Sequence, residues 1–196
     1  MFNQAINIIQ EEHRSLAAIV HGLKYLVNDA RSNTARADFK VLRAMLHYID
    51  AFPERLHHPK EDAYVFARLA ARTHEADDVI GELKKQHEEG TELVSALHTR
   101  LDAYEAGAAG GLAAFAEAVD AFTDAMWQHM ALEEKVLLPL AKQHLSDADW
   151  VEIAEAFGEN GDPRFSADAE DEFSALFSRI VTLAPPPIGV GPATGR

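Results

Sequence analysis

The sequence predicts an all-α protein whose core is a four-helix bundle, followed by extra helices at the C-terminal end. Two observations support this fold class. Apolar residues recur every three or four positions along four long stretches, which is the spacing of amphipathic helices. The stretches also repeat, because a helix bearing one histidine is followed by a helix bearing His-x-x-x-Glu, and this pair occurs twice. The chain therefore reads as two copies of one helix hairpin.

The clearest repeat is the His-x-x-x-Glu motif itself. It occurs at His57 with Glu61 and again, 72 residues later, at His129 with Glu133. Residues four apart share a helix face, and in the second copy this face is the apolar one. A buried ionised carboxylate needs a counter-charge or a metal, because moving its charge out of water without a partner costs free energy. The neighbouring Glu134 projects about 140° away from His129 and is expected to be a surface charge.

A weaker repeat, at an offset of 74 residues, aligns His13 with His87 on the other two helices. Four histidines and two glutamates would then converge in one bundle core, which is a set of metal ligands. The chain has no cysteine, so the donors are nitrogen and oxygen alone, and these suit iron, manganese or zinc. Residues that hydrogen-bond to the other ring nitrogen are expected to orient each imidazole, and Tyr25, Asp50 and Tyr64 are candidates.

The four bundle helices follow one another with short connections. Pro53 and Pro59 remove backbone donors in the second helix, so a break is expected near Phe52, with a bent or restarted helix beyond it. The third helix begins with Thr73 or His74 as its cap. The expected helices cover residues 3–29, 36–72, 74–106 and 112–144.

The domain boundaries follow from these elements. Residues 1–145 form the bundle, residues 146–184 form a helical extension that packs on the bundle or on a partner, and residues 185–196 form a disordered tail. The extension contains a short helix ending at Phe157 and a second helix over 167–183. The second helix has an apolar stripe that makes a homodimer through the extension a candidate; its residues are Phe173, Leu176, Phe177 and Ile180.

Composition narrows the classes of partner. The formal net charge of -14 argues against nucleic acid and anionic membranes. No stretch reaches the ~18 apolar residues of a membrane span, and no targeting signal opens the chain, so a cytoplasmic protein is expected. The absence of cysteine excludes disulfides and cysteine nucleophiles.

The order His13, His57-x-x-x-Glu61, His87 and His129-x-x-x-Glu133 resembles the hemerythrin-like family, also known as the HHE cation-binding domain. The resemblance covers roughly residues 3 to 144. It implies an up-down-up-down bundle that holds two non-haem iron ions, bridged by the two glutamates and by an oxo or hydroxo group. The four histidines would be terminal ligands, and an open position would take dioxygen or another small oxidant.

The sequence departs from the oxygen-carrying hemerythrins at two positions. These carriers have a second histidine one turn after the third-helix ligand, where this chain has Thr91, and their last acidic ligand lies five residues after its histidine, whereas Glu133 lies four after His129. A missing imidazole argues against reversible oxygen carriage. His58 and His21 are further candidate ligands, although a neighbouring role is favoured for His58.

Three functions stay open at this point. The first is a di-iron protein that binds or senses dioxygen or a related small oxidant. The second is a di-iron enzyme that consumes peroxide, or an iron storage or sensing protein. The third is a non-catalytic interaction module in which the histidine and glutamate pairs are structural, and the sequence does not decide whether the protein is an enzyme.

Overall fold

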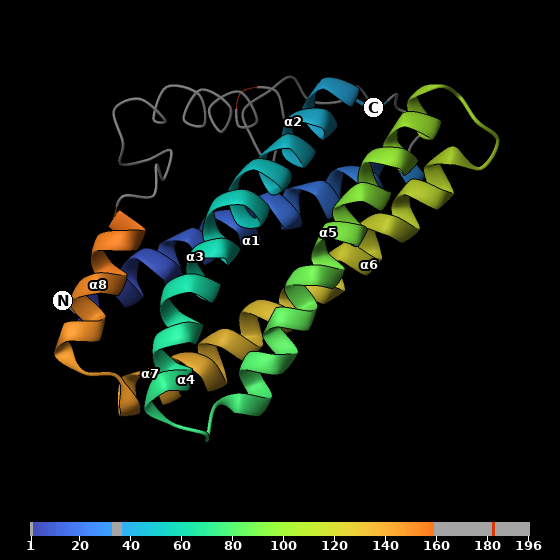
Figure 1. The fold of residues 1–196 in the computed structure, drawn as a ribbon. Coiled ribbons are helices and arrows are strands. Elements are labelled where there is room, and N and C mark those ends of the chain that lie inside the picture. The colour runs from blue at the N-terminus through green and yellow to red at the C-terminus, as the bar shows by residue number, and fades with distance from the viewer. Residues whose placement is uncertain (1, 33–36, 159–181, 183–196) are drawn as a thin grey trace.

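Four helical rods lie alongside one another and run alternately up and down, joined by short connections (Figure 1). The structure is a computed structural model and describes residues 2–32, 37–158 and 182. No strand occurs in these ranges. The first rod is α1 (Phe2–Ser32) and the third is α5 (Asp77–Glu105). The second rod contains α2 (Phe39–Ile49), η1 (Asp50–His57), α3 (His58–Lys60), η2 (Glu61–Phe66) and α4 (Ala67–Arg72); the fourth contains α6 (Gly111–Leu132), η3 (Glu133–Leu137) and α7 (Leu138–His144).

The rods begin and end where the sequence supplies the right residues. Asp38 caps α2 by accepting hydrogen bonds from the backbone N–H groups of Lys40 and Val41, at 2.9 and 3.3 Å. Gly110 adopts a φ of 72° in the turn between α5 and α6, a left-handed conformation that glycine tolerates best. The all-α four-helix bundle predicted from the sequence is confirmed.

The expected break near Phe52 is wrong, because the second rod continues through Pro53 as the π-helix η1. In a π-helix each backbone N–H bonds to the carbonyl five residues back, so a turn holds one residue more than an α-helical turn and the helix continues. The backbone N–H of His58 donates to the carbonyl of Pro53 in this way. Both repeated glutamates also begin π-helical segments, Glu61 in η2 and Glu133 in η3.

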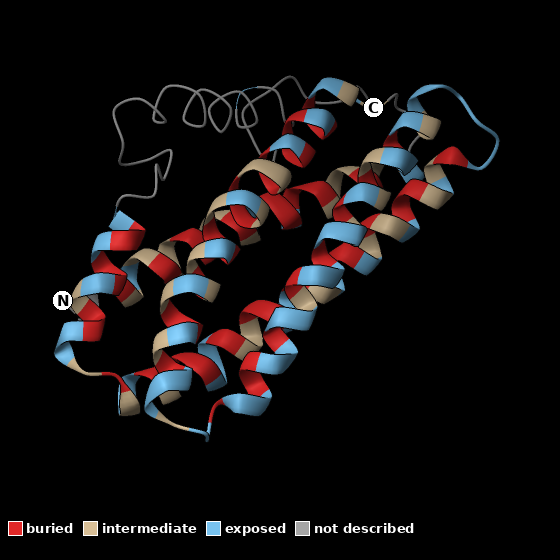
Figure 2. Cartoon of the chain, in the orientation of Figure 1, coloured by how far each residue is buried: buried red, intermediate tan, exposed pale blue. Residues whose placement is uncertain are grey.

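Buried residues run along the facing sides of the rods (Figure 2), and the apolar ones among them form two layers with a polar band between them. Along α1, Ile9 belongs to one layer and Leu16 to the other, and along α5 the same holds for Leu83 and Val94. The predicted histidines of these helices fall between the layers. The polar band is therefore enclosed by hydrophobic core on both sides.

The helix α8 (Asp147–Gly158) packs back on the bundle, against α1 and η2. Its buried residues Trp150, Ile153 and Phe157 join the core layer that contains Ile9. Three basic residues of the second rod hold it in antiparallel order. Lys60 donates to the carbonyl of Ala156 at 2.7 Å, Arg68 pairs with Glu152, and Arg72 pairs with Asp149 at 3.0 Å.

None of the described helices combines the length and the apolar character that a bilayer span demands. The helix expected over 167–183 and the tail expected over 185–196 lie outside the described residues, apart from residue 182.

Candidate metal centre

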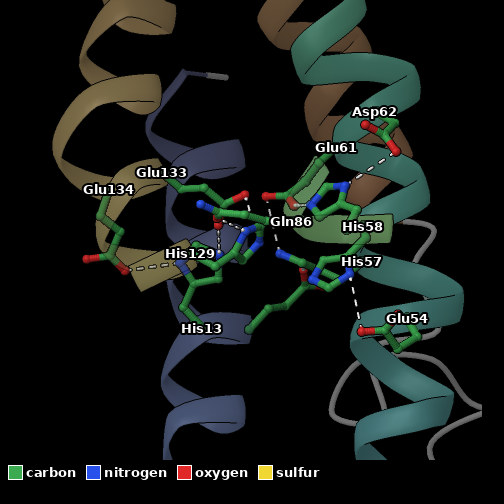
Figure 3. A network of polar contacts seen from close by, with 12 residues as sticks. His13, Glu54, His57, His58, Glu61, Asp62, Gln86, His129, Glu133 and Glu134 are labelled. Atoms are coloured by element: carbon green, nitrogen blue, oxygen red, sulfur yellow. Dashed lines mark hydrogen bonds and ion pairs between the residues drawn. The ribbon is translucent and has the colours of Figure 1, made fainter. Parts of the chain in front are cut away.

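Seven buried side chains converge between the two apolar layers. Figure 3 shows His13, His57, His58, Glu61, His129 and Glu133 among them. The exposed fractions of all seven lie between 0% and 8%. The six residues singled out in the sequence all take part, and His58 joins them. They are His13, His57, His58, Glu61, His87, His129 and Glu133.

These side chains form two overlapping groups, each with its ligand atoms within 4.8 Å of one another. The three-histidine cluster contains His58, His87 and His129 together with Glu61. The two-histidine cluster contains His13 and His57 together with Glu61 and Glu133. Glu61 thus belongs to both clusters. His21 is exposed and belongs to neither.

Each carboxylate extends one oxygen toward each cluster. Glu61 places Oε1 3.2 Å from Nε2 of His57 and Oε2 3.6 Å from Nε2 of His87. Glu133 places Oε2 3.1 Å from Nε2 of His13 and Oε1 3.4 Å from Nε2 of His129. This is the arrangement that two carboxylates bridging a pair of cations require.

The inward-facing atoms lack hydrogen-bond partners. Among the described residues, Nε2 of all five histidines, Oε2 of Glu61 and both carboxylate oxygens of Glu133 are buried without one. Buried polar atoms are rarely left in this condition, because each costs the free energy of desolvation. Imidazole nitrogens and carboxylate oxygens that converge in this way are the donor set of a metal site.

The outward-facing Nδ1 atoms have partners that the sequence analysis did not identify. Those of the two-histidine cluster face carboxylates: His57 lies 2.6 Å from Glu12, and His13 lies 3.1 Å from Glu134. A carboxylate accepts the hydrogen bond of an Nδ1–H group, which leaves the lone pair of Nε2 for a cation. Glu134 is therefore more than the surface charge expected from its helical phase.

The three-histidine cluster has weaker outer partners. Nδ1 of His129 lies 3.2 Å from the amide oxygen of Gln86, and Nδ1 of His87 lies 3.4 Å from Asp62. Nδ1 of His58 lies 3.7 Å from Oε1 of Glu54, an ion-pair distance rather than a hydrogen bond. The partners are thus not the tyrosines and Asp50 expected from the sequence.

Glu12 was missed although the sequence carried a signal. Counting from Ile9, it continues an i, i+3, i+7 pattern with Leu16 on α1, and an acidic residue in such a pattern is a candidate for burial. Its exposed fraction is 1%. Glu54 also carried a signal, because it lies four residues before His58 in the same rod. Gln86 and Asp62 carried none, because each contacts a histidine of another rod.

Charge is unevenly divided among the histidines. Burial lowers the pKa of His13, but contacts with Glu133 and Glu134 outweigh burial and raise it from 6.5 to about 9. Burial also lowers the pKa of His57, but Glu61 and Glu12 raise it well above 6.5. Burial lowers the pKa of His129 to about 3 despite the attraction of Glu61. Both histidines of the two-histidine cluster therefore favour positive charge, whereas in the three-histidine cluster the pKa is raised for His87 and lowered for His58 and His129.

The two central carboxylates differ in the same way. Burial raises the pKa of Glu61, but the charge of His57 outweighs burial and holds it well below 4.5. Burial and the negative charge of Glu61 raise the pKa of Glu133 to about 7. Two carboxylates this close repel each other when both are ionised, and positive charge between them would relieve the repulsion.

Comparison with known proteins agrees with this donor set. No curated protein and no solved structure matches the chain. Residues 4–141 match the family described as the hemerythrin HHE cation binding domain, which spans the four rods and ends before α8. The chain belongs to the hemerythrin HHE cation-binding domain family.

Proposed function

We propose that this domain binds two iron ions, bridged by Glu61, Glu133 and an oxo or hydroxo group, and that it binds or senses dioxygen or a related small oxidant. The observation that carries the proposal is the set of five buried Nε2 atoms without hydrogen-bond partners, facing two carboxylates. Five imidazoles and two carboxylates supply enough donors for two cations. A single cation would leave several of these buried atoms unsatisfied.

The chemistry of the donors supports iron. Iron, manganese and zinc all accept imidazole and carboxylate ligands, and no cysteine competes. The carboxylates of Glu61 and Glu133 offset part of the charge of two divalent or trivalent ions, and Glu12 and Glu134 add negative charge behind two of the imidazoles. Iron, when bound, supplies the reversible redox chemistry and small-molecule binding that zinc lacks.

The two clusters offer unequal numbers of donors. With both carboxylates shared, a cation at the three-histidine cluster has five protein donors and one at the two-histidine cluster has four. The second cation therefore has the more open coordination, and an external small molecule is expected there. His13 and His57 would hold this cation, with their rings fixed by Glu134 and Glu12.

His58 can replace the imidazole that is missing at Thr91. Its ring stacks on that of His87, with the ring centres 4.2 Å apart and the planes at 13°, so it supplies a third imidazole beside the missing position. Thr91 instead donates a hydrogen bond to Glu54 at 3.2 Å. The missing imidazole at Thr91 was the ground given against reversible oxygen carriage, and that argument loses its support.

An interaction module with purely structural pairs fits less well. Structural histidine and glutamate pairs form aligned hydrogen bonds, whereas the inward-facing nitrogen and oxygen atoms of the described residues lie at ion-pair distances of 3.1 to 3.6 Å without hydrogen-bond geometry.

Optical spectroscopy under controlled gas tests the proposed function. Iron-loaded protein is reduced without oxygen, exposed to dioxygen, and then returned to an oxygen-free atmosphere. An absorption change that reverses over several cycles supports binding, and an irreversible oxidation that alters the structure supports sensing. Continuous consumption of added peroxide with iron retained would favour the enzyme instead, and a spectrum insensitive to both gases and peroxide would contradict the proposal.

A further inference from the structure

A cavity of about 120 Å³ lies between α5 and α6 and reaches the three-histidine cluster. His58 and His129 form part of its lining, and so do the exposed side chains of Glu82 and Glu89. A water molecule needs ~10–15 Å³ on this measure, so the cavity accommodates several water-sized groups. It therefore connects the protein surface with donor atoms of the candidate metal centre.

The histidines in this cavity are unsatisfied. His58 is 5% exposed, and neither of its ring nitrogens has a hydrogen-bond partner among the described residues. Nε2 of His129 is also buried without a partner. The cavity therefore ends at imidazole nitrogens of the kind that bind transition-metal cations.

The charge of the lining selects for cations. Glu82 and Glu89 are the charged residues outside the cluster that line it, and both are acidic; Lys85 pairs with Glu89 at 3.4 Å but is not part of the lining. A cleft lined by one sign of charge concentrates ions of the other sign and accelerates their binding. The protein as a whole carries a formal charge of -14, which reinforces the effect.

A second cavity beside the site differs in charge. It measures about 230 Å³, lies next to the two-histidine cluster, and has Arg14 and Lys135 as well as Glu134 in its lining. A cation approaching there meets two basic side chains. The two openings are thus electrostatically distinct, and the acidic one leads to the cluster with more imidazoles.

We propose that the cavity between α5 and α6 is the route by which a divalent cation reaches the centre. A hydrated cation is attracted by Glu82 and Glu89, exchanges waters within the cavity, and is first captured by His58 and His129. The inference rests on the proposed metal centre and assigns a role to residues outside its ligand set.

The rate of metal uptake tests the charge of the route. Cobalt(II) is added to metal-free protein, and its visible absorption is followed by stopped flow. The double variant Glu82→Gln with Glu89→Gln should take up the metal about tenfold more slowly at low salt, with the final amount unchanged. The difference should shrink as salt is raised, because screening weakens the attraction.

A matched control separates the cavity from total charge. Glu88→Gln with Glu92→Gln removes the same charge from exposed positions of α5 outside the cavity lining, and should leave the rate close to wild type. Equal slowing of the two double variants, or no slowing of either, would overturn the proposal.

A steric variant tests the same route independently. Ala125 lines the cavity and is half-buried, so Ala125→Leu should fill it and slow uptake, whereas Ala121→Leu at an exposed position of α6 should not. Thermal unfolding of both variants checks that they are folded. If wild-type protein takes up no cobalt, the metal centre itself is refuted; if uptake is normal in every variant, only the route is refuted.

Discussion

Nδ1 of His57 lies 2.6 Å from Oε2 of Glu12, and both side chains are almost wholly buried. Glu12 comes from α1 and His57 from the second rod, so the contact joins two helices as well as fixing the ring. Ring orientation and donor strength at a metal site depend on such partners.

Replacing Glu12 should therefore weaken metal binding without removing a ligand. Glu12→Gln keeps the shape of the side chain but loses its charge, and we expect metal affinity to fall about 10–100-fold. Competition with a coloured chelator measures the change. Glu11→Gln, at a partly exposed neighbouring position, is the control and should bind like wild type. Equal affinity in the two variants would show that Glu12 does not act on the metal.

His58→Ala should reduce the metal content of the protein from two ions toward one per chain. The variant removes one of the three imidazoles of the three-histidine cluster and leaves His13 and His57 in place. Elemental analysis after loading and desalting measures the content. His21→Ala, at an exposed position outside both clusters, should retain two. Two tightly held ions in His58→Ala would exclude His58 as a ligand.

The metal-free protein should lose stability as the pH rises from 6.5 to 9. The pKa of His13 is about 9 in the folded protein against an ordinary value of 6.5, so its contribution is complete below pH 6.5 and disappears as the pH approaches 9. The pKa values of His57 and His87 are also raised and act in the same direction. Thermal unfolding at these two pH values should show a lower Tm at pH 9.

Metal should abolish most of this pH dependence, because the cation takes the place of the protons and binding releases them. A pH indicator in weakly buffered solution should record proton release when metal is added near pH 7. A Tm of the metal-free protein that stays constant or rises from pH 6.5 to 9 would contradict the assigned charges.

Phe157→Ala should loosen α8 and expose the two-histidine cluster. Phe157 is 1% exposed, and its ring centre lies 5.9 Å from that of His57. Truncating a buried phenylalanine costs about 3–5 kcal/mol, most of it here in the docking of α8. Hydrogen exchange over residues 147–158 should accelerate, and so should metal loss to a chelator. Glu155→Ala, on the exposed side of α8, should change neither; unchanged exchange in Phe157→Ala would show that α8 is held by other contacts.

The sequence was sufficient to predict the bundle and the six repeated histidines and glutamates that the structure brings together, whereas their binding of a metal stays a prediction. Helical periodicity gave the rods, and the recurrence of His57 and Glu61 as His129 and Glu133 distinguished buried pairs from ordinary surface residues. The match to the family over residues 4–141 agrees with that interpretation.

Local pattern could not predict what depends on helix phase or on contacts between helices. A π-helical turn changes the phase of every following residue, and η1 ends directly before His58. The inward position of His58 beside His57 therefore does not follow from α-helical spacing. Glu134 is partly exposed and still contacts His13, because α1 passes close to its side chain. Such contacts require the packing of the rods to be known.

Iron content per chain tests the central claim most directly. Metal-free protein is loaded with ferrous iron without oxygen, desalted, and analysed together with Glu133→Gln and the exposed control Glu117→Gln. We predict two irons per chain for wild type and for the control, and a clear loss for Glu133→Gln, which lacks the charge of a bridging carboxylate. One ion or none in the wild type, or two in Glu133→Gln, would contradict a bridged pair of cations at this site.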